Sequence, residues 1–373
     1  MNLRVGINLL WLVPGVVGGT EEYAVRLLGG LARHLPDDLD VTLFALPSLA
    51  DRHPDLITRY PSDLAPAAGR RPPLRVGLES TWLAQRSRRR SLDLLHHWGG
   101  TVPLVRTTPA LVTVHDLQPL HQPRHFGIVK RSWLAAVLPW SVRTSVRETG
   151  LVAAVSRFTG EDLSRRLGTD PAVVRVIPHG VDPITPPGAD EVDRVRRRYR
   201  LGERWFVHPA VTWPHKNHVM LLRAFAAVAA DREVELVLTG AAGPAETDVA
   251  AAIEHHGLGA RVRRTGRIPR ADLDALIAGA VALTFPSRFE GYGAPVLEAM
   301  ALGCPVVAAR ATALPEAVGD GGILLDPDDT EQWTRVMLHL MDDQGERRRL
   351  ITAGHARVDG AGWDRSGAAL VDA

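Results

Sequence analysis

Short runs of branched and aliphatic residues alternate along the chain with longer stretches in which apolar residues recur at helical spacing. The runs predict buried strands at residues 3–8, 41–45, 94–98, 110–117, 151–156, 205–211, 234–240, 262–267 and 283–285. The longer stretches predict helices, among them 21–35, 161–167, 221–230, 270–278 and 332–341. Strands that alternate with helices form parallel sheets, so the pattern predicts an α/β fold with doubly wound sheets.

Two segments interrupt this alternation. Residues 47–73 are rich in Pro, Asp and Arg and have no clear period, which predicts an irregular surface excursion. Residues 183–188 are rich in proline and predict a linker. A chain of 373 residues can form two domains with complete cores. We therefore expect a first domain at 1–183 and a second at 184–355.

The segment from Leu283 to Gly303 has the clearest local organisation. Its strand ends at Phe285, and residues 286–293 hold Pro, Ser and two glycines, so they must form a loop. Pro295 suits the first turn of a helix, where its missing N–H costs nothing, and Gly303 suits the left-handed end of that helix. The segment is predicted to run strand, glycine loop, helix.

A phosphate group fits this loop. Gly291 and Gly293 have no side chains, so their backbone N–H groups can approach an anion, and the start of the helix adds further N–H donors. Glu290 and Glu298 flank the loop, and a carboxylate can accept two hydrogen bonds from the vicinal hydroxyls of a ribose or hexose. An ordinary crossover with two solvated glutamates is an equally open reading from these residues alone.

Composition narrows the class of protein. Hydrophobic residues make up 45% and charged residues 23%, which describes a globular protein of net charge +2. Lys130 and Lys216 are the lysines among 44 basic residues, the rest being arginine. Basic and aromatic residues do not combine into a nucleic-acid-binding module, so nucleic acid is not an expected partner. Four arginines at 86–90 predict a solvated helix face, or a surface for an acidic acceptor or an anionic membrane.

The cysteine content and the N-terminus point to the cytoplasm. Cys304 is the one cysteine, which excludes an intrachain disulfide and fits a reducing compartment. It precedes an apolar run and is predicted to be a small buried side chain. Asn8 and Pro14 interrupt the apolar N-terminus, which predicts a first strand rather than a signal peptide. No uninterrupted run reaches the length of a membrane span.

The stretch Phe-Glu-Gly-Tyr-Gly-Ala-Pro-Val-Leu-Glu-Ala-Met-Ala, in which seven residues separate Glu290 from Glu298, resembles the signature of the family-4 retaining glycosyltransferases. The likeness continues through Gly303-Cys-Pro-Val-Val-Ala, Leu314-Pro-Glu316, Asp320-Gly-Gly and Leu325-Asp-Pro327. The resemblance implies the GT-B architecture, with two facing Rossmann-like domains, a deep interdomain cleft, and residues 356–373 crossing back to the first domain. It also implies transfer of a hexosyl group from a nucleoside-diphosphate sugar with retention at the anomeric carbon.

The resemblance further implies a set of site residues. The expected donor-binding residues are Gly18, Gly19, Lys216, Glu290, Gly291, Tyr292, Gly293, Ala294 and Glu298. The expected catalytic residues are His115, Lys216 and Glu290. In this assignment Glu298 binds the ribose, Glu290 and His115 contact the transferred sugar, and Lys216 faces the diphosphate together with the amides of Gly18 and Gly19.

One position departs from the family pattern. The family has an arginine and a lysine in the loop before the helix at 221–230, and both contact the donor phosphates. Here Lys216 matches the lysine, but Trp213, Pro214 and His215 stand where the arginine is expected. Either His215 or Arg288 is expected to take its place. A chain that uses arginine almost everywhere uses lysine here, which favours a specific role for Lys216.

A metal site would need several ligands to converge, and the sequence indicates no such set, so neither a metal ion nor another cofactor is expected. Likeness to bacterial mannosyltransferases implies GDP-mannose as the donor, and the acceptor is expected to be a glycan, a lipid-linked sugar or a small molecule. Residues 126–148 mix tryptophans with basic residues, and Pro139 predicts a kink. They are read either as a buried helix pair or, as the resemblance implies, as an acceptor-side segment that touches the inner face of the membrane.

Three alternative functions stay open beside glycosyl transfer. A nucleotide-sugar epimerase shares the architecture, and a degenerate member would bind a sugar nucleotide without turnover. A phosphorylase would need a lysine Schiff base with pyridoxal phosphate, and neither Lys130 nor Lys216 has a matching context.

Overall fold

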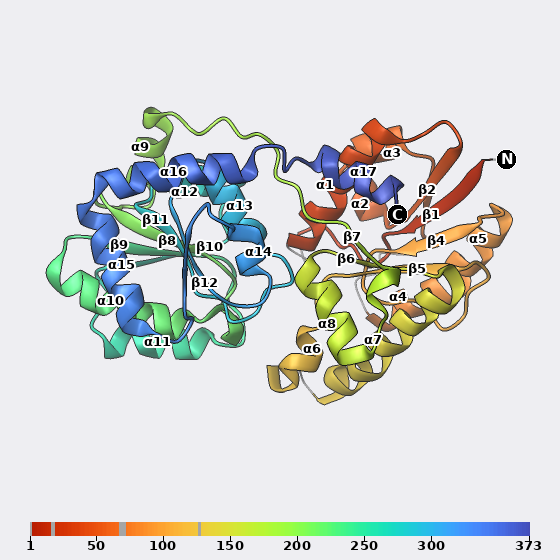
Figure 1. The fold of residues 1–373 in the computed structure, drawn as a ribbon, viewed down its shortest axis with the longest axis horizontal. Helices are drawn as coiled ribbons and strands as arrows, with labels where there is room; N and C mark the ends of the chain where they lie inside the picture. Colours follow the sequence, from red (N-terminus) through yellow and green to blue (C-terminus); the bar gives the residue numbers. More distant parts are fainter. Residues whose placement is uncertain (1, 16–18, 67–71, 126–127) are drawn as a thin grey trace. The chain divides into compact units, whose positions relative to one another are not determined.

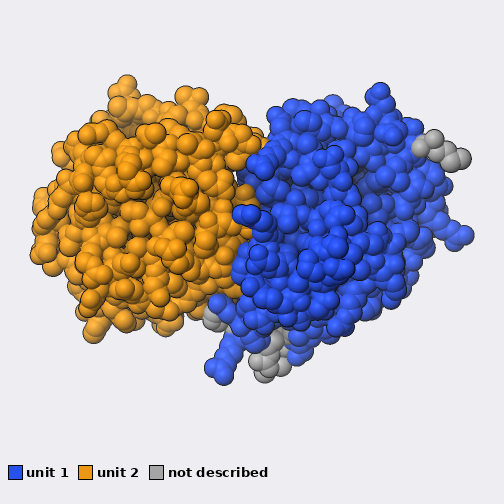
Figure 2. Space-filling view, in the orientation of Figure 1, with its two compact units in different colours: residues 1–180, 363–373 blue, residues 181–362 orange. Residues whose placement is uncertain are grey.

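The computed structural model describes residues 2–15, 19–66, 72–125 and 128–373. The chain forms two compact units (Figure 2): unit 1 is Met1–Gly180 with Trp363–Ala373, and unit 2 is Val181–Gly362. The division thus falls three residues before the expected boundary at 183, and the chain returns to unit 1 at Trp363 rather than at 356. Each unit has one parallel sheet with helices packed against it (Figure 1), so both are Rossmann-like.

The seven-stranded sheet of unit 1 has the order β3-β2-β1-β4-β5-β6-β7. Its strands are β1 (Leu3–Asn8), β2 (Leu39–Ala45), β3 (Ser62–Leu64), β4 (Leu94–His97), β5 (Ala110–Val114), β6 (Val152–Ala154) and β7 (Val174–Val176). All neighbours pair in parallel, with Ile7 beside both Leu43 and His96. The carboxyl ends of all these strands therefore lie at one edge of the sheet, where ligands bind in this type of fold.

The helices of unit 1 connect the strands and cover the sheet. They are α1 (Gly19–His34), α2 (Pro47–Arg52), α3 (Pro54–Arg59), α4 (Pro72–Leu78), a π-helical turn (Glu79–Leu83), α5 (Ala84–Arg89), α6 (Gln118–His121), α7 (Ile128–Thr149), α8 (Arg157–Leu167) and α17 (Trp363–Val371). Ser156 caps α8, as its position predicts, because its hydroxyl accepts a hydrogen bond from the N–H of Thr159. The C-terminal helix α17 packs along α1 (Figure 1).

The six-stranded sheet of unit 2 has the order β10-β9-β8-β11-β12-β13 and is parallel throughout. Its strands are β8 (Trp205–Pro209), β9 (Glu235–Thr239), β10 (Val262–Gly266), β11 (Ala282–Phe285), β12 (Val306–Ala309) and β13 (Ile323–Leu325). Its α-helices are α9 (Ala189–Arg198), α10 (His218–Asp231), α11 (Glu246–His255), α12 (Arg270–Ala278), α13 (Ala294–Ala301), α14 (Leu314–Val318), α15 (Thr330–Asp342) and α16 (Gln344–Val358). A short 3-10 turn at Pro214–Lys216 precedes α10.

The core of unit 2 is continuous and apolar. Trp205, Phe206, Phe225 and Phe285 are all buried between the sheet and its helices. Cys304 belongs to the same core, as predicted, and burial raises the pKa of its thiol to about 12. The thiol is therefore a packed apolar group at neutral pH.

Three sequence expectations are corrected by the structure. The excursion at 47–73 contains α2, α3 and β3, and each of the two helices begins at a proline, which suits the first helical turn. Strand β5 ends at Val114, so His115 and Asp116 lie in the following loop and not on the strand. The helix pair expected within residues 126–148 is instead the single helix α7, which continues through Pro139.

Within the described residues, no helix is both long and apolar enough to cross a membrane.

Candidate active site

The loop at residues 286–293 connects β11 to α13, in the strand, loop and helix order that its residues predict. Gly293 has a φ of 104°, and a Cβ atom there would lie 2.7 Å from Leu314 Cδ2, so this position requires glycine. Pro295 lies in the first turn of α13. The N–H groups of Gly293 and of the first residues of α13 therefore lie at the N-terminal end of α13. This end of the helix follows the carboxyl end of β11.

Lys216 and Glu290 meet in this region although 74 residues separate them. Lys216 Nζ lies 2.5 Å from Glu290 Oε1, and the two side chains are only 18% and 13% exposed. The ammonium also lies 5.2 Å from the centre of the Phe285 ring. Lys216 and Glu290 therefore form a partly buried ion pair in which the glutamate belongs to the glycine loop.

Glu298 is held by a different partner. Its Oε2 lies 3.0 Å from Arg270 Nη1, and Arg270 Nε also donates to Asp274 Oδ1 at 2.8 Å. Arg270 is the first residue of α12, and Glu298 lies on α13, with the carboxylate partly exposed. Arg270 could not be identified from the sequence as a site residue, because its position indicates only the start of a helix.

The two candidates for the missing arginine have different surroundings. The guanidinium of Arg288 pairs with Asp328, with Nε 2.9 Å from Oδ1. The ring of His215 is buried and stacks on Trp213, while its carbonyl accepts a hydrogen bond from the N–H of Arg288 at 2.8 Å. His215 therefore lies inside the loop that carries Lys216, whereas Arg288 points its charge at an aspartate.

A cavity of about 310 Å³ opens at the carboxyl ends of β8, β9 and β10. Its lining includes Thr212, His218, Gly240, Glu246 and Arg264. Glu246 pairs with Arg264 and accepts a hydrogen bond from Thr212 Oγ1 at 2.8 Å. Burial, together with the charges of Lys216 and Arg264, lowers the pKa of His218 to about 4, so its ring is neutral at pH 7. The cavity thus offers the carboxylate of Glu246, the guanidinium of Arg264 and the neutral imidazole of His218.

His115 is the expected sugar-contacting residue of unit 1. Its Nε2 lies 2.7 Å from the carbonyl oxygen of Trp98, and a carbonyl only accepts, so Nε2 carries the proton. Burial lowers the pKa of His115, which keeps the ring neutral at pH 7. The Nδ1 atom is then a hydrogen-bond acceptor beside the carboxyl end of β5.

The environment of His115 is aromatic. The ring of Tyr23 lies 5.2 Å from that of His115 and 4.4 Å from that of His179. His179 lies shortly after β7, and burial lowers its pKa well below the ordinary value. These rings fix the orientation of His115 through packing.

The N-terminal glycine loop is described in part. Gly19 is the exposed first residue of α1, and space surrounds its Cα. Gly18, the other expected diphosphate contact, lies outside the described residues. Glu21 stabilises the preceding turn, because its Oε2 accepts a hydrogen bond from the N–H of Gly15 at 2.7 Å while Oε1 contacts His53 Nε2.

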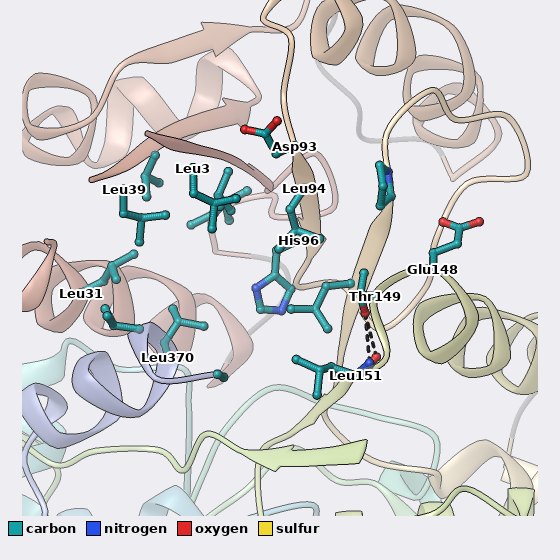
Figure 3. Close-up of a pocket in the computed structure, with 17 residues that line it drawn as sticks. Leu3, Leu31, Leu39, Asp93, Leu94, His96, Glu148, Thr149, Leu151 and Leu370 are labelled. Carbon is teal, nitrogen blue, oxygen red and sulfur yellow. Dashed lines mark hydrogen bonds between the residues drawn. The ribbon is translucent and has the colours of Figure 1, made fainter. Parts of the chain in front are cut away.

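A second cavity, of about 370 Å³, lies in unit 1 but away from His115 (Figure 3). Leu3, Leu39 and Leu94 line it, and each is the first residue of its strand. Leu31 of α1 and Leu370 of α17 close its other side (Figure 3). It is an apolar hollow at the amino ends of the strands, opposite the edge where a substrate is expected.

The structure therefore brings together Lys216 and Glu290 beside Gly291, Tyr292, Gly293 and Ala294. Glu298 follows on the same helix and pairs with Arg270. In the described part of the chain, no three His, Cys, Asp or Glu side chains converge as a metal site would require.

Solved structures place the fold in a known class. Alr3699/HepE from Anabaena, in complex with UDP and glucose, is 20% identical to this chain and superposes with a TM-score of 0.75 over 100% of this chain and 99% of that one. WaaG, a glycosyltransferase involved in lipopolysaccharide biosynthesis, gives a TM-score of 0.71 at 16% identity and covers 95% of each chain. The fold is that of the GT-B glycosyltransferases, as the resemblance implies.

Two family models match the sequence. Residues 17–184 match glycosyltransferase family 4, and residues 191–357 match the glycosyl transferases group 1. The chain belongs to this family of glycosyltransferases. This confirms the resemblance that was based on the motif around Glu290 and Glu298.

Curated relatives have several activities. O-antigen chain mannosyltransferase B of Escherichia coli is 27% identical over 277 residues, which are 73% of this chain and 71% of that protein. D-inositol 3-phosphate glycosyltransferase of Salinispora arenicola is 32% identical over 74% of this chain, but only 63% of that protein is covered. The match to the MMP alpha-(1->4)-mannosyltransferase of Mycolicibacterium hassiacum, at 31% identity, likewise spans 61% of that protein.

Proposed function

We propose that the chain transfers a hexosyl group from a nucleoside-diphosphate sugar to a glycan, lipid-linked or small-molecule acceptor, with retention at the anomeric carbon. The observation that carries the proposal is the Lys216–Glu290 pair at the glycine loop that opens α13. Mannose carried by GDP is the donor of first choice, because the relatives include an O-antigen chain mannosyltransferase and an MMP alpha-(1->4)-mannosyltransferase.

In this proposal the donor enters between Lys216 and Glu290. Donor phosphate oxygens compete with the Glu290 carboxylate for the Lys216 ammonium, and Glu290 then accepts hydrogen bonds from the hexose hydroxyls. The first amides of α13 and the glycine loop add partial positive charge near the diphosphate. Glu298, held by Arg270, accepts the ribose hydroxyls farther along the helix.

The reaction follows a front-face route. The bond between the anomeric carbon and the diphosphate oxygen breaks, and the acceptor oxygen bonds to the same face of the sugar. The acceptor's proton passes to the departing phosphate oxygen, so no side chain needs to act as a nucleophile. Lys216 and the backbone amides stabilise the charge that develops on the diphosphate. We place no metal ion in this step, because cationic and amide donors already face the phosphate.

His115 orients the transferred sugar. Its Nε2–H is committed to the Trp98 carbonyl, which leaves Nδ1 to accept a hydrogen bond from a sugar hydroxyl. A neutral ring suits this role, since an imidazolium could not accept.

A basic and apolar surface of unit 1 supports contact with an anionic membrane, on the cytoplasmic side. Leu104 and Val105 are 73% and 57% exposed at the tip of a loop. Thr107 in the same loop donates to the Ala84 carbonyl at the start of α5, the helix that carries exposed Arg88 and Arg89. Exposed apolar residues combined with exposed arginines are the composition of an interfacial anchor. Co-sedimentation with anionic but not zwitterionic vesicles, lost in Leu104→Asp, is the expected result.

The test of the function is an assay of nucleoside diphosphate release over a panel of sugar nucleotides, with and without acceptor. Acceptor-dependent release that persists in excess chelator supports transfer without a metal. Release without an acceptor product points to hydrolysis, and conversion of the sugar without release points to an epimerase. A thermal-shift screen of nucleoside diphosphates identifies the base, since a ligand at 100 times its Kd adds about 2.7 kcal/mol of stability.

A further inference from the structure

Strained backbone flanks the Lys216–Glu290 pair on both sides. Among the described residues, four that are not glycine have a positive φ: Ser91, Arg200, Asn217 and Thr312. Asn217 directly follows Lys216, and Thr312 is hydrogen-bonded to Glu290. Positive φ values in residues with a Cβ are uncommon and gather at functional sites, where surrounding contacts maintain them.

Asn217 joins three loops at the carboxyl edge of the unit 2 sheet. Its φ of 61° and ψ of 33° are left-handed, between the 3-10 turn that contains Lys216 and helix α10. The side chain is 3% exposed, and Nδ2 donates to the carbonyls of Pro286 at 3.2 Å and Pro327 at 2.7 Å. Pro286 begins the glycine loop, and Pro327 follows β13. Both hydrogens of the Asn217 side-chain amide therefore form hydrogen bonds that connect the turn containing Lys216 to the loops at Pro286 and Pro327.

Thr312 holds the other member of the pair. It lies between β12 and α14 with a φ of 50°, which is a clear outlier for a β-branched residue. Its Oγ1 accepts a hydrogen bond from the N–H of Glu290 at 2.9 Å. The N–H of the next residue, Ala313, points at the Glu290 carbonyl at 3.4 Å. Both backbone polar groups of Glu290 thus face the strained turn.

We propose that Asn217 and Thr312 are positioning residues that hold Lys216 and Glu290 in place for sugar transfer. The proposal rests on the proposed function and adds to it two residues that act through Lys216 and Glu290. Glycine would adopt either backbone conformation without strain, but it has no side chain to make these hydrogen bonds. The side-chain bonds therefore explain why residues with a Cβ stand at both strained positions.

The first test compares three variants at Thr312. Thr312→Val keeps the branched shape and removes the acceptor, whereas Thr312→Ser keeps the hydroxyl. We expect Thr312→Val to lower kcat about tenfold, the worth of one hydrogen bond, with little change in Kd for the free nucleoside diphosphate. Thr312→Ser should turn over like the wild type. Thr312→Ala makes the same comparison if Thr312→Val does not fold. Equal loss in the serine and valine variants would overturn the proposal.

The second test does not depend on turnover. Because the chain has only two lysines, an amine-selective reagent read by mass spectrometry reports Lys216 directly, with Lys130 as the internal reference. Release of Glu290 should expose Lys216, so Thr312→Val and Asn217→Gly should label several-fold faster at Lys216 and unchanged at Lys130. Unchanged labelling at Lys216 would reject the positioning role.

Matched controls come from the other two left-handed positions. Ser91→Gly and Arg200→Gly relieve the same kind of backbone strain at exposed sites, and neither should alter kcat or Lys216 labelling. If either control variant changed kcat or Lys216 labelling as much as Thr312→Val does, the change would have to be attributed to backbone strain in general and not to the contacts of Thr312. If the wild type releases no nucleoside diphosphate with any donor, the proposed function fails, and the labelling result alone decides whether Asn217 and Thr312 hold the pair.

Discussion

The ammonium of Lys216 and the carboxylate of Glu290 compensate each other's charge in the absence of a ligand. A donor changes this balance, since its diphosphate attracts the ammonium and its hexose hydroxyls attract the carboxylate. Removing one member of a partly buried pair leaves the other uncompensated. The effect of a substitution at Lys216 or Glu290 therefore has to be measured both as a change in turnover and as a change in ligand binding.

Lys216→Ala should lower turnover more than it weakens binding of the donor. The charge on the diphosphate grows as the sugar departs, so the ammonium stabilises the transition state more than the ground state. Steady-state kinetics and titration with the nucleoside diphosphate measure the two effects. Equal loss in both, or loss in neither, would remove Lys216 from the catalytic residues.

Glu298→Ala should weaken donor binding by roughly 10- to 100-fold, because a hydrogen bond to a charged group contributes about 1.5–3 kcal/mol. The substitution also leaves Arg270 with Asp274 as its partner, which limits the structural cost. Isothermal titration with nucleoside diphosphate checks the affinity, and a thermal melt checks the fold. Wild-type affinity in a folded variant would show that the ribose is bound elsewhere.

Glu290→Gln keeps the size of the side chain and one acceptor oxygen but removes the charge. It should cut turnover strongly and leave the affinity for free nucleoside diphosphate nearly unchanged, since that ligand has no hexose. A single-turnover assay beside an equilibrium titration separates these effects. A large loss of nucleoside diphosphate affinity would place Glu290 at the phosphates instead.

The residues found from the sequence are those whose role follows from local spacing. Glu290 and Glu298 stand out because a glycine loop and a proline-started helix surround them, and Lys216 because lysine is rare here. Arg270, Asn217 and Thr312 could not be found in this way. Thr312 lies 22 residues from its partner Glu290, and Asn217 reaches Pro327 across 110 residues, so only the folded chain reveals these contacts.

At the scale of elements, helices and strands were predicted correctly where the spacing of apolar residues agrees with the residues found at the ends of the element. Helix α12 and strand β1 have the predicted bounds, and Ser156 caps α8. The expectations that failed are the irregular segment at 47–73, the strand expected to reach His115 and the helix pair expected at α7. Proline starts α2 and α3, and Pro139 is tolerated inside α7 because packing of the whole helix outweighs one missing hydrogen bond.

The contact between α1 and α17 gives a prediction about stability. A Cβ atom on Gly30 would lie 2.1 Å from the carbonyl oxygen of Trp363, so Gly30→Ala must separate the helices. We expect a loss of about 1–3 kcal/mol in the free energy of unfolding, the usual cost of overpacking. Urea denaturation provides the measurement.

Gly29→Ala is the matched control, because open space surrounds Gly29 in the same helix. It should stabilise the chain by up to about 1 kcal/mol through helix propensity alone. If Gly30→Ala and Gly29→Ala had the same effect, the close approach of α17 to α1 would contribute nothing to stability.

At the scale of the whole molecule, the central consequence of the proposed function is stereochemical. If the acceptor oxygen bonds to the face that the diphosphate leaves, the product keeps the configuration of the donor. An α-linked donor such as GDP-mannose should therefore give an α-linked product. The anomeric proton and carbon signals of the purified product, read by nuclear magnetic resonance, decide the point. A β-linked product would require attack from the opposite face and a catalytic base, and it would overturn the assignment of Lys216, Glu290 and the leaving phosphate as a sufficient catalytic set.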